Sequence, residues 1–291
     1  MEDLLLSTAE VEYLSKKLVS ADPARDVREL FRKLMGVADL VKKVVSVRYH
    51  KNFDELLKHL ALLNGSNPLQ TKQASYTDRD SNKLFELYVG LLAMRIGRDV
   101  RMDDPYRPSG GNPDVLATID AARWGFACKV PYSRNAQSIL DNIVRGVKQI
   151  EKSEANKGAV ILGARNILAR DSFWPELADS DGGTGEARYG AFPTVDIPAA
   201  MLAAEALDLQ HMLVDEVGAA EMVRAFRGPR SVSVSGFLLH AMVASAIQGG
   251  GAPEPTSISR MMVVQAEGLD ASAMRVVCML NDAAQWYPRY A

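Results

Sequence analysis

The most constraining feature of the sequence is a pair of short apolar runs at residues 115–119 and 124–130, joined by the turn-like residues 120–123. Short runs rich in Val, Ile, Thr, Phe and Trp are typical of strands, and the brief connection predicts an antiparallel hairpin. Asp114 comes directly before the first run, and Lys129 lies near the end of the second. The hairpin would therefore bring one acidic and one basic residue to neighbouring strand ends.

Strand alternation decides whether these two residues meet. Asp114 shares a strand face with Leu116, and Lys129 shares one with Ala127, because side chains alternate between the two faces of a strand. If the two faces coincide, the carboxylate and the ammonium lie together. Such a pair could hold a divalent cation and orient or deprotonate a water, since hard cations prefer oxygen ligands. The alternative is a cross-strand ion pair on the surface, which contributes a few tenths to about 1 kcal/mol.

The segments around the hairpin predict an α/β core. A helix is expected to begin with Asp80 or Ser81 as its N-cap and to end at Gly97. The other elements are a short strand, an amphipathic helix and a buried apolar strand, at residues 99–102, 136–154 and 158–164 respectively. The predicted order is helix, three strands, helix and strand.

The chain divides into three regions. Residues 1–66 predict a helical N-terminal region, residues 67–170 contain the core, and residues 171–291 form a C-terminal extension that is helical with at least one strand. In the extension we expect helices at residues 198–217, 237–247 and 272–286, and a strand at residues 258–265. The pattern is compatible with an extension that continues the central sheet and with one that forms a separate lobe.

Composition limits the classes of protein. The chain has 291 residues and is 47% hydrophobic, so it can bury a substantial core. Its formal net charge of -2 argues against binding of nucleic acid through bulk positive charge, although a local basic groove is compatible with that total. Two cysteines, Cys128 and Cys278, suggest neither a disulfide framework nor a thiolate zinc site. An acidic N-terminus and the lack of an apolar run of about 18 residues predict a cytoplasmic protein that does not span a membrane.

Glu86 is an acidic residue in an otherwise apolar stretch of the helix before the hairpin. Its apolar neighbours cover most of the helix circumference: Leu84, Phe85, Leu87, Tyr88, Leu91 and Leu92. An ionised carboxylate among apolar side chains is unfavourable unless a cation or a hydrogen-bond donor meets it. We therefore expect a partner for Glu86, the alternative being a partly solvated glutamate near the first turn of the helix.

The arrangement resembles the PD-(D/E)XK nuclease superfamily, also called restriction-endonuclease-like: Glu86 lies on a helix, Pro113-Asp114 opens one strand, Lys129 closes the next, and a helix and a strand follow. The similar part extends from residue 81 to about residue 168. The resemblance implies a restriction-endonuclease-like core of order αβββαβ with a mixed central sheet. It also implies metal-dependent cleavage of phosphodiester bonds in nucleic acid, with DNA favoured over RNA.

The resemblance assigns roles to individual residues. Asp114 would be the central metal ligand and Glu86 an auxiliary acid. Lys129 would be the catalytic lysine, which positions or activates the attacking water. The backbone carbonyl of Cys128 would be a further metal ligand, and the cofactor would be Mg²⁺ or Mn²⁺.

The sequence departs from this family at residue 127. The family pattern places Asp or Glu two residues before the lysine, whereas this sequence has Ala127, so that the motif reads Ala-Cys-Lys. Either Glu86 supplies the missing acid, or the site is degenerate and the protein is a catalytically inactive nucleic-acid-binding or assembly subunit of the same fold. A further alternative is a protein-interaction module of unrelated α/β type, in which Asp114 and Lys129 form a plain ion pair.

A second similarity concerns the helix after the hairpin. Gln149-Ile150 resembles the Gln-hydrophobic motif of the helicase-associated exonuclease branch, in which a tyrosine follows at the position of Ser153. The resemblance makes Gln149 an auxiliary site residue. The alternative is a helix residue that faces solvent.

Basic residues flank the predicted site and could contact nucleic-acid phosphates, the alternative for each being ordinary solvated charge. They are Lys72, Arg79, Lys83, Arg107, Arg134, Arg145 and Lys148. The four histidines show no metal-ligand spacing, which predicts structural or surface roles. The helical region and the C-terminal extension could clamp the substrate or form a homodimer or a protein complex.

Overall fold

The computed structural model describes residues 28–64, 79–107, 111–174, 191–227, 236–248, 253–265 and 270–285. They form an α/β fold around one six-stranded mixed sheet with the strand order β1-β2-β3-β4-β5-β6. The strands are β1 (Arg98–Met102), β2 (Val115–Ile119), β3 (Ala122–Lys129), β4 (Lys157–Gly163), β5 (Gly236–Gln248) and β6 (Pro253–Gln265). Strands β3, β4 and β5 are parallel, whereas the pairs β1–β2, β2–β3 and β5–β6 are antiparallel.

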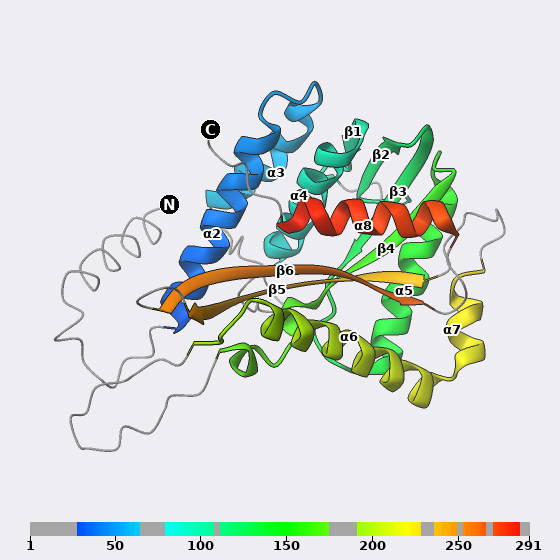
Figure 1. Cartoon of the computed structure of the whole chain (residues 1–291). Coiled ribbons are helices and arrows are strands. Elements are labelled where there is room, and N and C mark those ends of the chain that lie inside the picture. The colour runs from blue at the N-terminus through cyan, green and yellow to red at the C-terminus, as the bar shows by residue number, and fades with distance from the viewer. Residues whose placement is uncertain are drawn as a thin grey trace, which may run out of the picture.

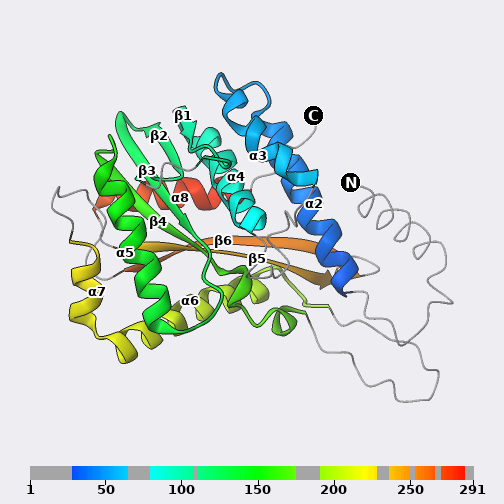
Figure 2. The same ribbon diagram turned by 180° about the vertical axis from the view of Figure 1, so that it is seen from behind.

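Helices cover both faces of this sheet (Figures 1 and 2). One face carries α2 (Arg28–Val47), α3 (Leu57–Ala61), α4 (Arg79–Ile96) and α8 (Ala271–Gln285), and the other carries α5 (Ala136–Lys152), α6 (Asp196–Val217) and α7 (Ala219–Ala225). Short 3-10 turns flank α3 at Phe53–Leu56 and Leu62–Asn64, and two more follow β4 at Ala164–Asn166 and Arg170–Phe173. The result is a three-layer arrangement with a core on each side of the sheet.

Alternation along the hairpin strands separates the two cores. Val115 and Phe126 pack in the core beneath α4, whereas Leu116 and Ala127 pack in the core beneath α5. Lys129 has the same strand parity as Ala127 and therefore points toward the α5 layer. The hairpin end thus lies between the two helical layers.

The hairpin turn is tighter than the four residues expected from the sequence. Asp120 and Ala121 have φ angles of 48° and 64°, and Ala122 already pairs with Ile119. Two positive φ values between antiparallel strands are typical of a type I′ turn, whose twist matches that of the flanking strands. This turn fixes the register of β2 against β3.

Most predicted elements are confirmed. Strand β2 has the predicted bounds, and α4 ends immediately before Gly97. The elements that lie within a few residues of their expected positions are β1, β4, α5, α6 and α8. Strand β6 ends where predicted but begins five residues earlier. The N-terminal region is helical where it is described, and residues 1–27 and 65–78 lie outside the described residues.

Two predictions are wrong. Residues 237–247 form strand β5 and not a helix, because β5 is buried on both faces and a strand of this kind reads as a continuous apolar run. Asp80 and Ser81 do not cap α4, because the helix already includes Arg79.

The C-terminal extension continues the central sheet. Strand β5 pairs in parallel with β4, and β6 pairs with β5 along the full length of both strands. Within the described part of the chain, no helix combines the length and the apolar character needed to cross a membrane.

Candidate functional site

Asp114 and Lys129 lie together at the end of the β2–β3 hairpin. The register pairs Val115 with Phe126, which puts Asp114 opposite Ala127. Lys129 Nζ is 3.5 Å from Asp114 Oδ2, and the two side chains are 15% and 7% exposed. The ion pair is therefore largely buried, and the alternative of a pair on the surface is wrong.

The Asp114 carboxylate is fixed by the backbone of β3. Its Oδ2 accepts a hydrogen bond of 2.6 Å from the Cys128 N–H. Buried backbone donors require a partner, so this bond satisfies the Cys128 amide and orients the carboxylate at the same time. Asp114 Oδ1 accepts no hydrogen bond from any described residue.

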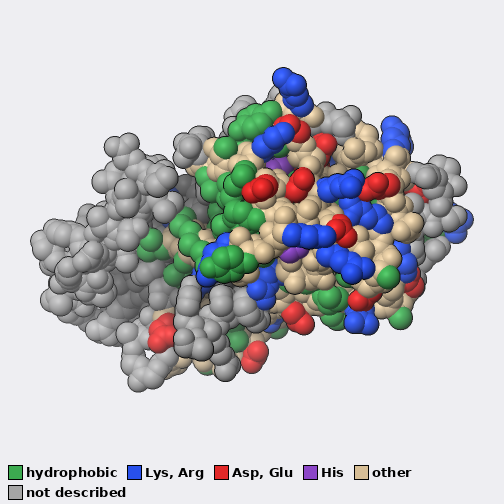
Figure 3. Space-filling view, turned by 90° about the horizontal axis from the view of Figure 1, so that it is seen from above, with side chains coloured by type: hydrophobic (Ala, Val, Ile, Leu, Met, Phe, Trp, Pro, Cys, Tyr) green, Lys and Arg blue, Asp and Glu red, His purple; other side chains and the backbone are tan. Residues whose placement is uncertain are grey.

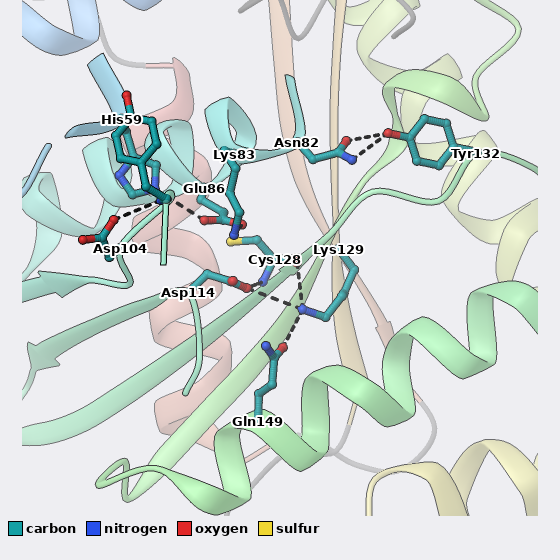
Figure 4. A network of polar contacts seen from close by, with 11 residues as sticks. His59, Asn82, Lys83, Glu86, Asp104, Asp114, Cys128, Lys129, Tyr132 and Gln149 are labelled. Carbon is teal, nitrogen blue, oxygen red and sulfur yellow. Dashed lines mark hydrogen bonds and ion pairs between the residues drawn. The ribbon is translucent and has the colours of Figure 1, made fainter. Parts of the chain in front are cut away.

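Lys129 is held by two hydrogen bonds and one ion pair (Figure 4). Its Nζ donates to Gln149 Oε1 at 2.5 Å and to the Cys128 carbonyl at 3.0 Å, in addition to the Asp114 contact. Gln149 lies on α5, so this helix reaches the strand end through one side chain. This contact agrees with the prediction that Gln149 is an auxiliary site residue. It does not agree with the alternative that Gln149 faces solvent.

Glu86 reaches the same region from α4, on the opposite face of the sheet. It is 5% exposed. Lys83 Nζ donates to Glu86 Oε1 at 2.7 Å, and His59 Nε2 lies 3.4 Å from Oε2. Both carboxylate oxygens thus have a partner, as the apolar surroundings of Glu86 predict.

Burial and charge alter the acidity of these groups. Burial raises the pKa of Glu86, although Lys83 opposes the shift. Burial and the nearby Glu86 carboxylate raise the pKa of Asp114 to about 6. Burial lowers the pKa of His59 to about 4, so its imidazole is neutral at neutral pH. Two neighbouring buried carboxylates with raised pKa values are typical of sites that hold a cation or move a proton.

Cys128 contributes through its backbone. The N–H binds Asp114, and the carbonyl accepts from Lys129. The thiol is buried, and burial raises its pKa well above the usual value, which excludes a thiolate nucleophile at neutral pH.

The donor set fits a hard cation that keeps part of its water shell. Asp114 and Glu86 supply carboxylate oxygens, and Mg²⁺ is commonly held by one or two carboxylates together with waters and substrate phosphates. No group of three or more His, Cys, Asp or Glu residues among the described ones is arranged to hold a metal ion. Among the described residues of this region, Asp114 and Glu86 are the carboxylates that could serve as ligands of such a cation.

Sequence reasoning missed two of the partners of Glu86. Lys83 precedes Glu86 by three residues, and residues at this spacing face each other on a helix, so their contact could have been predicted. His59 gives no local signal, because its contact with Glu86 arises only from the packing of α3 on α4.

A second polar cluster joins α4 to the ends of β3 and β4. Asn82 Nδ2 donates to Tyr132 Oη at 2.6 Å, while the Tyr132 hydroxyl lies 2.9 Å from Asn82 Oδ1. Arg165, which is 2% exposed, donates to the same Asn82 oxygen at 3.2 Å. Asn82 directly precedes Lys83 in the sequence, and in Figure 4 the pair of Asn82 and Tyr132 lies to the upper right of Asp114 and Lys129.

Three of the basic residues expected to contact nucleic acid have polar partners within the protein. Lys83 pairs with Glu86, Arg134 pairs with Glu205 at 2.9 Å, and Arg145 donates to Asn142; Lys72 lies outside the described residues. Over the described part of the face in Figure 3, Lys and Arg side chains are interspersed with Asp and Glu.

Comparison of the chain with protein-family models, with curated proteins and with solved structures gave no match. The geometry of the site and the resemblance of the sequence to the PD-(D/E)XK superfamily are therefore the basis on which a function can be proposed.

Proposed function

We propose that the protein is a metal-dependent phosphodiesterase that cleaves nucleic acid, with DNA favoured over RNA, and that its core belongs to the PD-(D/E)XK type. The observation that carries this proposal is the largely buried pair of Lys129 and Asp114 beside the buried acid Glu86. The order α4, β1, β2, β3, α5, β4 also agrees with the αβββαβ order that the resemblance implies. A homodimer or a complex with other proteins is part of the same proposal.

In the proposed reaction, the carboxylates bind the cation and the lysine orients the attacking water. Asp114 and Glu86 would hold Mg²⁺ or Mn²⁺, with the Cys128 carbonyl as a further ligand, and a bound cation supplies charge stabilisation to the scissile phosphate. The Lys129 ammonium already makes three contacts, which are two hydrogen bonds and the ion pair with Asp114. The contact with Asp114, at 3.5 Å, is the longest of the three, so it is the one that an attacking water can replace. Lys129 would then donate a hydrogen bond to that water and orient it.

An inactive protein of the same fold is the second candidate, and Ala127 is the observation that favours it. Ala127 is fully buried, and its methyl group faces Gly146 of α5. No carboxylate stands at this position, and both oxygens of Glu86 already have partners. Such a protein would bind nucleic acid without cutting it.

Cleavage assays separate these candidates. Labelled single- and double-stranded DNA and RNA are incubated with Mg²⁺ or Mn²⁺ and with wild type, Asp114→Asn, Glu86→Gln or Lys129→Met. We expect metal-dependent cleavage that falls at least about a hundredfold in each variant. Lys157→Met is the matched control, because Lys157 is a half-buried lysine at the opposite end of the parallel strands, paired with Asp270 at 3.0 Å.

The outcomes are distinct. Cleavage that survives in all three site variants contradicts the proposal. If no substrate is cut but wild type binds nucleic acid with an affinity that falls steeply as salt increases, the inactive protein is the better description. Circular dichroism of each variant shows whether its fold is retained.

A further inference from the structure

The proposed metal site contains as many ammonium groups as carboxylates. Glu86 and Asp114 face Lys83 and Lys129 respectively. Magnesium sites depend on the negative charge of their ligands, and position 127, where the family has an acid, holds alanine. In the cation-free protein the four charges therefore compensate one another.

The partners of the two carboxylates, which are Lys129, His59 and Lys83, differ in burial and in the number of contacts that hold them in place. Lys129 donates hydrogen bonds to β3 and α5 and pairs with Asp114. His59 is fully buried. Lys83, whose side chain is 22% exposed, makes its hydrogen bond within the described residues to Glu86 alone. Lys83 is thus the partner that can leave most easily, since it would exchange one acceptor for water.

We propose that Lys83 is a resident counter-ion that occupies Glu86 in the cation-free protein and gives way to Mg²⁺ or Mn²⁺. This inference rests on the proposed function, because it takes Glu86 and Asp114 as the cation ligands. Lys83 and the divalent cation compete for one carboxylate, so the lysine weakens cation binding. Once displaced, the ammonium lies on the first turns of α4 beside the site, where a substrate phosphate can accept its hydrogen bonds. Lys83 would then stabilise the bound substrate at the moment when the cation is in place.

The competition predicts opposite effects of one substitution on two measurements. Removal of the lysine charge leaves Glu86 available, so Lys83→Gln should bind Mn²⁺ about tenfold more tightly than wild type, equivalent to about 1.4 kcal/mol. The same variant should cleave nucleic acid with a higher KM, because the phosphate contact is lost. Lys83→Arg retains the charge and should bind Mn²⁺ with an affinity close to that of wild type.

The test is isothermal titration calorimetry of the full-length chain with Mn²⁺ alone, without nucleic acid. Lys58→Gln is the matched control: Lys58 is 61% exposed and pairs with Asp104, so its removal changes the net charge equally without touching Glu86. Tighter Mn²⁺ binding in Lys83→Gln, but not in Lys58→Gln or Lys83→Arg, supports the inference. Affinity in Lys83→Gln that equals or falls below that of wild type overturns it, provided that circular dichroism shows a folded variant.

Failure of this inference can be separated from failure of the proposed function. If wild type binds Mn²⁺ and Asp114→Asn does not, the metal site is supported whatever the result for Lys83→Gln. If neither wild type nor Lys83→Gln binds Mn²⁺, the metal site is refuted and the role of Lys83 with it. If Lys83→Gln unfolds, Lys83→Met serves as a second charge-removing variant, judged by the same affinity criterion.

Discussion

The side-chain oxygen of Gln149 lies 2.5 Å from the Lys129 ammonium and so joins the end of β3 to the last turns of α5. The contact spans 20 residues of sequence and links two layers of the fold. Because Gln149 accepts a hydrogen bond from the Lys129 ammonium, we interpret it as a positioning residue for Lys129.

Gln149→Ala should reduce kcat between about tenfold and a hundredfold and leave KM for the nucleic acid nearly unchanged, because a misplaced ammonium orients the water poorly. Gln149→Glu retains an acceptor for Lys129 and should recover part of the rate. Gln137→Ala is the control on the same helix, since Gln137 is exposed and binds Asp141. A purely structural role for Gln149 would instead lower the unfolding temperature without this split between kcat and KM.

The sequence predicted the hairpin and the meeting of Asp114 with Lys129 because strand periodicity and a short turn determine which side chains share a face. It also predicted that Glu86 would be buried and partnered. It could not identify His59, whose contact depends on how α3 packs against α4. The sequence predicts a helix where β5 lies because residues 237–247, which are apolar or small except for His240, fit a buried helix as well as a strand buried on both faces.

Asp114 should make the stability of the protein depend on pH. Its pKa is raised from 3.8 to about 6 in the folded state. The folded protein therefore binds the proton of Asp114 more tightly than the unfolded chain does. The contribution of Asp114 to the free energy of unfolding is complete below about pH 3.8 and is lost as pH rises through about 6. The loss amounts to up to about 3 kcal/mol. Asp114→Asn removes this dependence. Urea unfolding in EDTA should thus show wild type losing free energy of unfolding relative to Asp114→Asn between these pH values.

The comparison must be made as a difference between wild type and variant. Burial lowers the pKa of His59 to about 4 and that of His240 to about 3, so both histidines stabilise the fold increasingly as pH rises through this range. The contribution of His240 is common to both proteins and cancels in the difference, whereas that of His59 cancels only in part, because the Asp114 charge raises the pKa of His59 against the effect of burial. A difference that does not change with pH would contradict a raised pKa for Asp114.

The turn residue Ala121 provides a test of backbone strain far from the site. Its φ of 64° lies in the left-handed region, which costs a residue with a Cβ roughly 1–2 kcal/mol. Glycine adopts this conformation without that cost but loses more entropy on folding. Ala121→Gly should therefore increase the free energy of unfolding by about 0.5–1 kcal/mol. The control is Ala203→Gly in the exposed face of α6, which should decrease it by a similar amount.

Restoring an acid at position 127 tests the metal site most directly. Ala127 is fully buried opposite Asp114, so Ala127→Asp would place a second carboxylate beside the first in a region closed by Gly146. Without metal, this buried and unpaired charge should lower the free energy of unfolding by at least about 2 kcal/mol. With Mn²⁺, a cation bound between the carboxylates should offset part of the loss, because a ligand that binds only the folded state stabilises it by RT ln(1 + [L]/Kd). The measurement is the unfolding temperature in EDTA and in Mn²⁺.

Ala127→Asn separates charge from size in this experiment. Asparagine fills nearly the same volume as aspartate and also buries a polar group, so Ala127→Asn should be destabilised in EDTA as well. Its side chain, however, offers a cation no negative charge. The Mn²⁺-induced rise in unfolding temperature should consequently be larger for Ala127→Asp than for Ala127→Asn and larger than for wild type. Equal rises in the two variants would mean that a carboxylate at position 127 does not ligate the cation, whereas no rise in any of the three proteins would mean that no cation binds beside it. Asp114 and Lys129 would then form a structural ion pair that ties β2 to β3, and the nuclease proposal would lose its metal.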